Sequence, residues 1–475
     1  MHRMSIRKTF SLLAGLPAIA GYGQNDARPN VLLIMVDDLR PELGCYGEEA
    51  IRTPVMDSLA NHSLLFRNAY CNAPVSGASR ASMLTGLYPK LPERFTHAYT
   101  YAEKDAPDAI PLPRWFRDHG YHTLSNGKVF HNVDDHATAW SEQPWRVHRE
   151  GYESHWAVYN KWELWMSDVS ARTIHPKTMR GPFYESAEVS DSAYQDGKVA
   201  LKTIADLRRM KEQNQPFFLA CGFWRPHLPF NAPKKYWDLY NREEIPLADN
   251  FYRSEGLPQQ VKAPTEINSY GGVGDKSEED FQRLAKQGYY ACVSYVDAQI
   301  GLLLNELREL SLEESTIVVI LGDHGWQLGE HSFWGKHTLM KRSTQIPLII
   351  HLPGQKGAKS DLMVELVDLY PTLCDLTGIP QPEGQLQGLS FAPSFTDSRF
   401  KGKEAVFVQW GNGDNAINRR YSYAKWRDKR NDTEAEMMFD HQRDPEENRN
   451  VADERAYRPM KNHLSRLIDH LRSKL

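Results

Sequence analysis

Short apolar runs that end abruptly in polar side chains are the feature that most limits how this chain can fold. Two of the runs end in a pair of potential ligand residues: residues 31–36 lead into Asp37-Asp38, and residues 317–321 lead through Gly322 into Asp323-His324. Continuous apolar runs of this length predict strands that are buried on both faces of a mostly parallel sheet. Because ligands bind at the carboxyl ends of such strands, we expect the two polar pairs to meet there, although they lie far apart in the sequence.

Further runs of the same kind cover residues 217–221 and 347–352, and we expect both to be buried parallel strands. Helices are expected between the strands. Thr53-Pro54 predicts the start of a helix that reaches about Asn68, and a capping box over residues 277–280 predicts another helix, ending near residue 310. This alternation indicates an α/β sandwich around one large, mostly parallel sheet.

The last part of the chain has a different pattern. Residues 380–402 are rich in Gly, Pro, Ser and Gln and predict a connection. Short antiparallel strands and a final helix are expected after it, over residues 405–409, 420–426, 437–440 and 454–474. A chain of 475 residues exceeds one ordinary domain. We therefore predict a catalytic domain over residues 24–392 and a small C-terminal α+β subdomain over residues 393–475.

The N-terminus has the pattern of a secretory signal peptide. Basic residues up to Lys8 precede an apolar run from Phe10 to Ala20, and polar residues follow. This order predicts a signal peptide over residues 1–23, although a basic N-terminal arm is the alternative. No later stretch approaches the length of a membrane span. We therefore expect a secreted protein, in a bacterial periplasm or at the cell surface.

Cysteine usage and charge narrow the class further. The five cysteines are scattered singly, which predicts small buried side chains with at most one or two disulfides. The chain has 57 Lys and Arg against 61 Asp and Glu, a formal net charge of -4. Nucleic-acid binders normally carry a basic surplus, so we expect no nucleic-acid partner.

The most specific local pattern runs from Ser76 to Gly86, with the sequence Ser-Gly-Ala-Ser-Arg-Ala-Ser-Met-Leu-Thr-Gly. Taken alone, Ser76 is also a plausible helix N-cap. The segment resembles the signature of the formylglycine-dependent (type I) sulfatases, in which a Cys or Ser is oxidised to formylglycine. Ala78 stands where Pro is usual in that signature. Cys71 does not fit, since Val75 occupies the position that the signature gives to Arg. The resemblance implies that Ser76 is the modified residue and that a radical-type maturase is a partner during biogenesis.

The two polar pairs after the strands indicate a metal site. Adjacent carboxylates repel each other unless a cation joins them, and hard oxygen ligands suit Ca²⁺ or Mg²⁺. Either pair alone is also compatible with solvated loop residues. The resemblance to the sulfatases implies one Ca²⁺ ion, surrounded by Asp37, Asp38, Asp323, His324 and the formylglycine at position 76. Imidazole is a less usual calcium ligand, so His324 is alternatively a hydrogen-bond partner of the sulfate or the nucleophile.

Three loop motifs supply cations: Gly127–His131, Arg225–Phe230 and Gly335–His337. Each alone is an ordinary charged loop. Together they match the positions at which sulfatases hold the anion, and the resemblance extends to these catalytic and substrate-binding residues: Arg80, Lys128, His131, His227 and Lys336. Groups aimed at the developing charge lower the barrier to sulfate transfer. We expect Asp323 to assist attack on sulfur, His227 (alternatively Lys336) to protonate the leaving alcohol, and His131 to remove a proton from the second hydroxyl.

Within the family, the chain most resembles the iduronate 2-sulfatase, or uronate 2-O-sulfatase, branch. The resemblance is carried by residues 127–131, 225–230, 322–331, 334–336 and 346–350, whereas residues 438–448 resemble the end of many sulfatases. It implies an alkaline-phosphatase-like sandwich. It also implies a sulfated oligosaccharide substrate with a 2-O-sulfated, saturated or unsaturated uronic acid at the non-reducing end. Fragments of heparin, heparan sulfate or chondroitin sulfate fit this description.

Other interpretations remain open at this point. The substrate alternatives are another sulfated sugar position, such as a 6-O-sulfated hexosamine, and a phosphonate or phosphate monoester. A non-catalytic glycan-binding protein descended from a sulfatase is a further alternative. Five tryptophans between Trp140 and Trp165 are compatible with a sugar platform or with the packing of a long insertion. Arg146, His148 and Arg149 are compatible with binding of a uronate carboxylate or with an ordinary charged surface.

Overall fold

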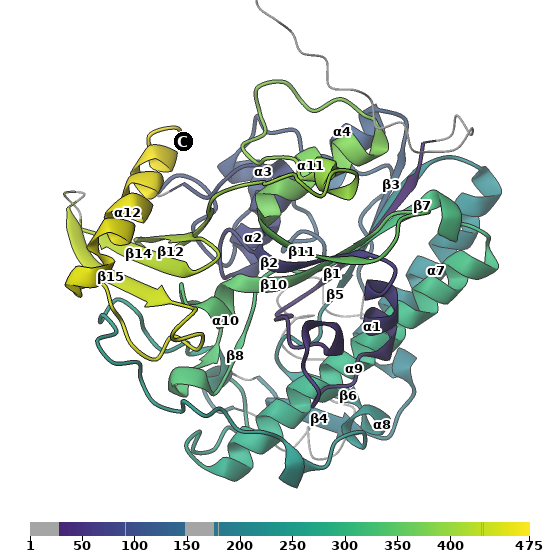
Figure 1. Ribbon diagram of the computed structural model, residues 1–475. Helices are drawn as coiled ribbons and strands as arrows, with labels where there is room; N and C mark the ends of the chain where they lie inside the picture. Colours follow the sequence, from purple (N-terminus) through teal and green to yellow (C-terminus); the bar gives the residue numbers. More distant parts are fainter. Residues whose placement is uncertain (1–27, 91, 148–174, 179, 429, 431) are drawn as a thin grey trace, which may run out of the picture.

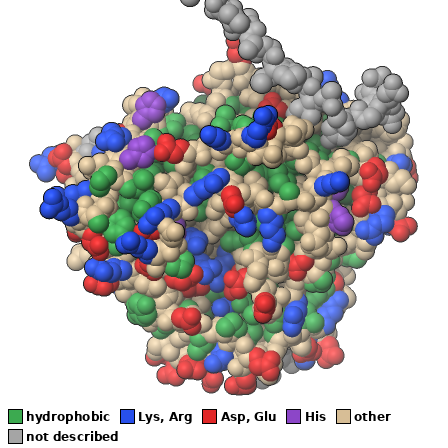
Figure 2. Space-filling view, viewed as in Figure 1, with side chains coloured by type: hydrophobic (Ala, Val, Ile, Leu, Met, Phe, Trp, Pro, Cys, Tyr) green, Lys and Arg blue, Asp and Glu red, His purple; other side chains and the backbone are tan. Residues whose placement is uncertain are grey.

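The computed structural model describes residues 28–475, apart from residues 91, 148–174, 179, 429 and 431. The predicted signal peptide, residues 1–23, therefore lies outside the described residues. Among the described helices, none is both long enough and apolar enough to cross a membrane. Acidic and basic side chains are interspersed over the face in Figure 2, in keeping with the nearly neutral net charge.

One seven-stranded sheet forms the centre of the molecule (Figure 1), in the order β11-β2-β10-β7-β1-β5-β3. Its strands are β1 (Asn30–Val36), β2 (Leu64–Tyr70), β3 (His122–Gly127), β5 (Phe217–Phe223), β7 (Thr316–Gly322), β10 (Gln345–His351) and β11 (Ala358–Glu365). The central pairs β1·β5, β1·β7 and β3·β5 are parallel, as is β11·β2. The predicted large, mostly parallel sheet is confirmed.

Strand β10 is the exception to the parallel arrangement. It pairs antiparallel with both β2 and β7, so the prediction that residues 347–352 form a parallel strand is wrong in its direction. An apolar run predicts burial on both faces but carries no information on strand direction. Here the connection between β7 and β10 passes through the functional loops and returns the chain antiparallel beside β7.

Helices cover both faces of the sheet, as Figure 1 shows. Alternate residues of β1 enter two separate cores: Val31, Leu33 and Met35 belong to one, while Leu32, Ile34 and Val36 belong to the other. Helices α2 (Ser76–Thr85), α4 (Leu112–Asp118) and α11 (Leu369–Thr377) pack into the first core. Helices α1 (Pro54–Ala60), α7 (Gln195–Gln213) and α9 (Glu279–Glu309) pack into the second. The α/β sandwich is therefore as predicted.

Two helix predictions need correction. The helix that begins at Pro54 ends at Ala60 instead of continuing to Asn68, because the chain turns into β2 at Leu64. The hydrophobic run at the start of β2 is buried in the sheet, and this tertiary packing outweighs local helix propensity. The long helix α9 does reach Glu309, but its N-cap is Glu278, and no side-chain capping bond is present there.

The C-terminal part forms a second, smaller sheet with the order β12-β13-β14-β15. Its strands are antiparallel: β12 (Val406–Trp410), β13 (Gly413–Ile417), β14 (Tyr421–Arg427) and β15 (Thr433–Asp440). Helix α12 (Arg458–Arg472) packs its apolar side chains Leu464 and Ile468 against this sheet. Strand β13 was not predicted. The small α+β unit is otherwise as expected.

Short elements complete the fold around the carboxyl edge of the main sheet. They are α3 (Ala102–Asp105), α8 (Lys234–Trp237), α10 (Lys341–Thr344) and the paired short strands β4 (Tyr184–Ala187) with β6 (Phe230–Pro233) and β8 (Gln327–Leu328) with β9 (Trp334–Gly335). All five cysteines lie among the described residues as free thiols, four of them buried. This agrees with the expectation of few or no disulfides.

Candidate active site

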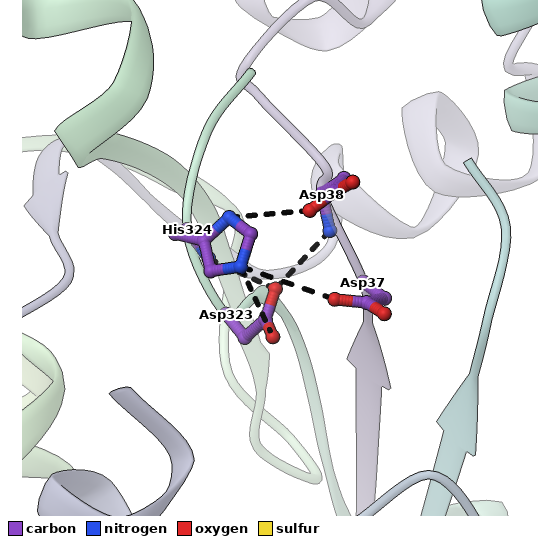
Figure 3. A group of neighbouring side chains, drawn as sticks. All are labelled: Asp37, Asp38, Asp323 and His324. Atoms are coloured by element: carbon purple, nitrogen blue, oxygen red, sulfur yellow. Dashed lines mark hydrogen bonds and ion pairs between the residues drawn. The ribbon is translucent and has the colours of Figure 1, made fainter. Parts of the chain in front are cut away.

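The two polar pairs predicted to meet do meet, at the carboxyl ends of β1 and β7 (Figure 3). Asp37, Asp38, Asp323 and His324 each offer a ligand atom, and these atoms lie within 4.8 Å of one another. The backbone N–H of Asp38 donates to Asp323 Oδ1 at 3.1 Å. All four side chains are completely buried. The parallel register of β1 and β7 places both strand ends together.

Ser76 reaches this cluster from the N-terminus of α2. Its hydroxyl donates to Asp37 Oδ1 at 2.9 Å and lies 3.0 Å from Nε2 of His324. The N-cap position belongs to Val75, and no side chain caps this helix; Ser76 is therefore not a simple helix cap. Gly77 is required beside it, because a Cβ there would lie 2.1 Å from the carbonyl oxygen of Ala98.

Arg80 and Lys128 occupy the inner side of the site. Arg80 Nε donates to Asp323 Oδ2 at 2.8 Å, and its Nη1 donates to the carbonyl oxygens of Lys128 and Val129. Lys128 Nζ forms a close ion pair with Asp37 and lies 3.5 Å from the Ser76 hydroxyl. Both cations are completely buried. Buried charges persist only when they are paired. The acidic cluster supplies the counter-charges that allow both cations to be buried here.

A second group of side chains links His227 and Lys336. Lys336 Nζ donates to Asp38 Oδ1 at 2.9 Å and lies 3.2 Å from Glu266 Oε2. His227 Nε2 lies 3.1 Å from Glu266 Oε1 and 4.0 Å from Asp38 Oδ2. Glu266 belongs to the short 3-10 helix Glu266–Ser269. It thus holds together the two residues predicted to act on the leaving group.

A cavity of about 240 Å³ opens onto Ser76. His131 lines it, as do His227 and Lys336. The structure therefore brings together all the catalytic and metal-ligand residues proposed from the sequence: some surround the acidic cluster and the others line the cavity. The remaining lining residues are Val75, Ala98, Tyr99, Arg180, Thr265, Glu266 and His337.

One ring of the cavity wall is backed by the C-terminal sheet. The His337 ring stacks on the ring of Trp410 in β12, with centroids 4.9 Å apart and planes at 10°. Burial lowers the pKa of His337 to about 4, so this ring is neutral at neutral pH. A neutral ring stacked on an indole gives the cavity an aromatic wall.

Burial and neighbouring charges set the protonation of the cluster. Burial raises the pKa of Asp38 and, to a lesser degree, that of Asp323. Burial alone would also raise the pKa of Asp37, but the cations led by Lys128 lower it overall. Burial lowers the pKa of His324 well below its usual value. His324 is therefore a neutral imidazole, able to accept at one ring nitrogen.

The acidic cluster fits a hard divalent cation. Three of its members offer carboxylate oxygens, the ligands that Ca²⁺ and Mg²⁺ prefer. Asp38 Oδ2 is buried and has no hydrogen-bond partner among the described residues. A buried acceptor without a donor is costly, and a cation would satisfy it. The residues thus match the metal site that was predicted from the sequence.

The aromatic insertion and its arginine are only partly described. Trp140 is buried, with its ring 6.3 Å from that of Phe218 in the core. Arg146 donates to the carbonyl oxygens of Gly127, Phe130 and His131. It therefore braces the loop that carries Lys128 and His131. Trp145 is partly buried against the second core. The other members of the two groups, Trp156, Trp162, Trp165, His148 and Arg149, lie outside the described residues.

The cavity residues that sequence reasoning missed include Tyr99, Arg180 and Glu266. Each lies in an irregular loop or a single helical turn. Neither strand position nor local spacing marks such residues, and only the folded chain places them beside Ser76. His337 was included in a predicted cationic motif, but its role as a neutral wall was not foreseen.

An α/β sandwich whose strands end in a hard-metal site, with a helix N-terminus and several cations around one hydroxyl, defines a metal-dependent hydrolase of anionic esters. The family model described as sulfatase matches residues 29–379. The chain therefore belongs to the sulfatase family and is a sulfuric ester hydrolase. A second model, described as N-sulphoglucosamine sulphohydrolase, C-terminal, matches residues 329–474.

Two relatives are similar over most of their length. The chain is 36% identical over 408 residues to iduronate 2-sulfatase of Homo sapiens, covering 74% of this chain and 70% of that one. It is 34% identical over 426 residues to iduronate 2-sulfatase of Mus musculus, covering 79% and 74%. These similarities confirm the family and the branch that the sequence motifs resemble.

A solved structure confirms the alkaline-phosphatase-like fold. The phosphonate monoester hydrolase of Agrobacterium radiobacter superposes with a TM-score of 0.75, covering 94% of this chain and 96% of that one. The sequence identity is 21%. At this identity the likeness shows a shared fold, and it does not extend to the substrate.

Proposed function

We propose that this protein is an exported sulfatase that removes the 2-O-sulfate from a uronic acid at the non-reducing end of a glycosaminoglycan fragment. The observation that carries the proposal is a buried acidic cluster bonded to the Ser76 hydroxyl, in a chain 34–36% identical to the iduronate 2-sulfatases. Heparin, heparan sulfate and chondroitin sulfate fragments are the substrate class, with a saturated or unsaturated terminal uronate.

The size of the cavity supports action at a chain end. Its volume of about 240 Å³ is below the roughly 300–1,000 Å³ typical of sites for drug-sized ligands. A single sulfated sugar ring is a better match for this volume than the interior of a polysaccharide. The sulfate would enter towards Ser76, and the rest of the glycan would extend out of the cavity.

The cofactors of the proposal are one Ca²⁺ ion and a formylglycine made from Ser76 by a radical-type maturase. Asp37, Asp38, Asp323 and His324 would hold the ion together with residue 76. When present, the oxidised residue supplies the nucleophile, and the cation neutralises charge on the sulfate. Export is proposed from the basic and apolar pattern of residues 1–23.

Sulfate binding and the orientation of the site are assigned to side chains of the chain itself. Lys128 and Lys336 bind the sulfate oxygens, because both ammonium groups point into the acidic cluster beside Ser76. Arg80 fixes Asp323 through its Nε and the Lys128 loop through its Nη1. These contacts orient Asp323, the base, and Lys128, a cation, before the substrate binds. This is the preorganisation that electrostatic catalysis requires.

Proton transfer is assigned to two histidines. His227 Nε2 lies 3.1 Å from Glu266 Oε1 and gives a proton to the leaving oxygen. Burial, together with Lys336, lowers the pKa of this ring, whereas Glu266 favours its protonated form, so a proton that it carries is readily transferred. His131, which lines the same cavity, takes a proton from residue 76 to release sulfate. Lys336 is the alternative donor to the leaving oxygen.

Sulfate release from defined disaccharides tests the proposal. Protein with the aldehyde mass at residue 76 would be incubated with disaccharides that carry one sulfate each, and sulfate measured by ion chromatography. We expect release from 2-O-sulfated uronates and none from 6-O-sulfated hexosamines. Release from another position would keep the sulfatase and reject the proposed specificity. Faster cleavage of a phosphonate monoester than of any sulfate ester would instead support the phosphonate alternative.

A further inference from the structure

The cations around the cavity differ in what they contact. Lys336 is paired with Asp38 and Glu266, and His227 with Glu266. These pairs tie both residues to the sulfate end of the cavity. Arg180 also lines the cavity, but its described contacts are with Ser269 and Tyr270 and not with Glu266 or Asp38.

The contacts of Arg180 fix the orientation of its guanidinium. Its Nη1 donates to Ser269 Oγ at 2.6 Å, and the group lies 4.9 Å from the centre of the Tyr270 ring. Stacking on an aromatic face and a directed hydrogen bond are the contacts that orient a guanidinium plane. The group is therefore held in place as part of the cavity wall.

The backbone around Arg180 is joined to the short helix that carries Glu266. The hydroxyl of Thr178 donates to the carbonyl oxygen of Ser269, the last residue of that helix. Two further backbone bonds follow, from Gly271 to Gly181 and from Phe183 to Gly271. One short segment thus positions both a cation and a carboxylate on the cavity.

We propose that Arg180 binds the carboxylate of the substrate sugar and so selects uronic acids over neutral sugars. The inference rests on the function proposed above and deepens it. A planar guanidinium matches a carboxylate in a two-pronged hydrogen bond, which an ammonium group cannot reproduce. Arg146, one of the three candidates from the sequence, donates to three backbone carbonyl groups.

The other cavity residues are consistent with this assignment. Tyr99 is 48% exposed, so its ring offers a surface for the sugar. Glu266 is paired with His227 and Lys336, which holds these two groups at the sulfate end. A second anion-binding group at Arg180 would favour one orientation of the ring.

The experiment pairs two substrates with three variants. The substrates are a 2-O-sulfated uronate disaccharide and its carboxyl-reduced analogue, in which the carboxylate is a neutral hydroxymethyl group. The variants are Arg180→Ala, Arg180→Lys and, as a charge-matched control, Arg399→Ala at an exposed site whose side chain pairs with Asp397. Aldehyde content at residue 76 would be matched by mass spectrometry, and kcat/KM measured for each pair.

Arg180→Ala should lower kcat/KM on the uronate by about 10–100-fold, because a hydrogen bond to a charged group is worth about 1.5–3 kcal/mol. On the reduced analogue the same variant should lower kcat/KM by less than about threefold. Arg180→Lys should lose less, and Arg399→Ala should match the wild type on both. Inhibition by inorganic sulfate should be unchanged in all three.

Two results would overturn the role of Arg180. One is an equal loss on both substrates; the other is weaker inhibition by sulfate, which would place Arg180 at the sulfate instead. If the wild type cleaves the reduced analogue as fast as the uronate, the proposed uronate specificity itself is rejected, whatever the variants show. The wild-type measurement therefore separates failure of the proposed function from failure of this inference.

Discussion

Oε1 of Glu266 lies 3.1 Å from Nε2 of His227, in the wall of the active-site cavity. The same carboxylate reaches Lys336 Nζ at 3.2 Å. Glu266 thus holds the ring nitrogen that we assign to the leaving group, and at the same time holds the alternative proton donor. We regard it as a positioning residue, since it acts through the side chains that it orients.

Glu266→Gln should therefore lower kcat by about tenfold or more on a sugar sulfate, because general acid catalysis contributes about 100–10,000-fold. An aryl sulfate has a leaving group that hardly needs a proton, so its kcat should change little. Steady-state kinetics on both substrates would measure this difference. Asn268→Ala, an exposed change in the same short helix, is the matched control. Equal losses on both esters would contradict a role in leaving-group protonation.

Ser76→Ala should abolish turnover and leave the fold intact. The side chain is buried, but its hydroxyl is bonded to the acidic cluster and not to the helix that it begins. Sulfate release should fall by more than about 1,000-fold, as expected when the nucleophile of an interdependent site is removed. Circular dichroism and thermal unfolding would verify the fold, with the exposed Ser58→Ala as control. Substantial residual release would refute the assignment of residue 76.

Removal of the divalent cation should lower both activity and thermal stability. Without a cation, Asp37 and Asp38 are adjacent buried carboxylates beside Asp323. A ligand that binds only the folded state stabilises it by about 2.7 kcal/mol at 100 times its Kd. Chelation should therefore lower Tm, and Ca²⁺ should restore it, as followed by scanning fluorimetry. Asp38→Asn should show a smaller response; an identical response would place the cation elsewhere.

Glu330→Gln should destabilise the fold by about 3–5 kcal/mol, because it removes one carboxylate from the buried ion pairs of Arg40. Arg40, completely buried after β1, pairs with Glu42 and with Glu330 Oε1 at 2.8 Å. Burial would raise the pKa of Glu330, but Arg40 lowers it overall. The wild-type advantage should therefore be complete above the unfolded pKa of about 4.3 and decline as the pH falls below it.

Urea unfolding of the wild type and Glu330→Gln at several pH values would measure this difference. Glu279→Gln, whose exposed side chain pairs with Arg283, should change the free energy of unfolding by less than about 1 kcal/mol. A Glu330→Gln variant as stable as the wild type at pH 7 would show that Glu330 contributes nothing net to the network.

The parts of the fold and site that the sequence predicted share one physical basis. Asp37 and Asp323 follow strands whose burial is evident from composition, and parallel strands bring their ends together. Glu266 and Arg180 lie on irregular segments that are placed by long-range contacts, so no local pattern marks them. The same limit explains the helix that was predicted past Ala60.

Strand β13 was missed for a related reason. Its sequence, Gly-Asp-Asn-Ala-Ile, has the polar and glycine residues of a turn. In the folded chain all five residues are buried. Asn415 is satisfied there by the carbonyl oxygen of Leu339, at 2.8 Å, and by Ser422. A polar residue can enter a buried strand when distant partners satisfy it, and those partners are not visible in a short window.

The stacking of His337 on Trp410 makes one ring of the cavity wall depend on the smaller sheet. His337 follows Lys336 directly, whereas Trp410 is contributed by a strand more than seventy residues later. Mutations in β12 would therefore move a cavity-lining ring without altering a residue that performs chemistry. Relatives with unchanged catalytic groups could diverge towards different glycans by this route. Conversely, a catalytic domain that is transferred without this sheet would lose the support of the His337 ring.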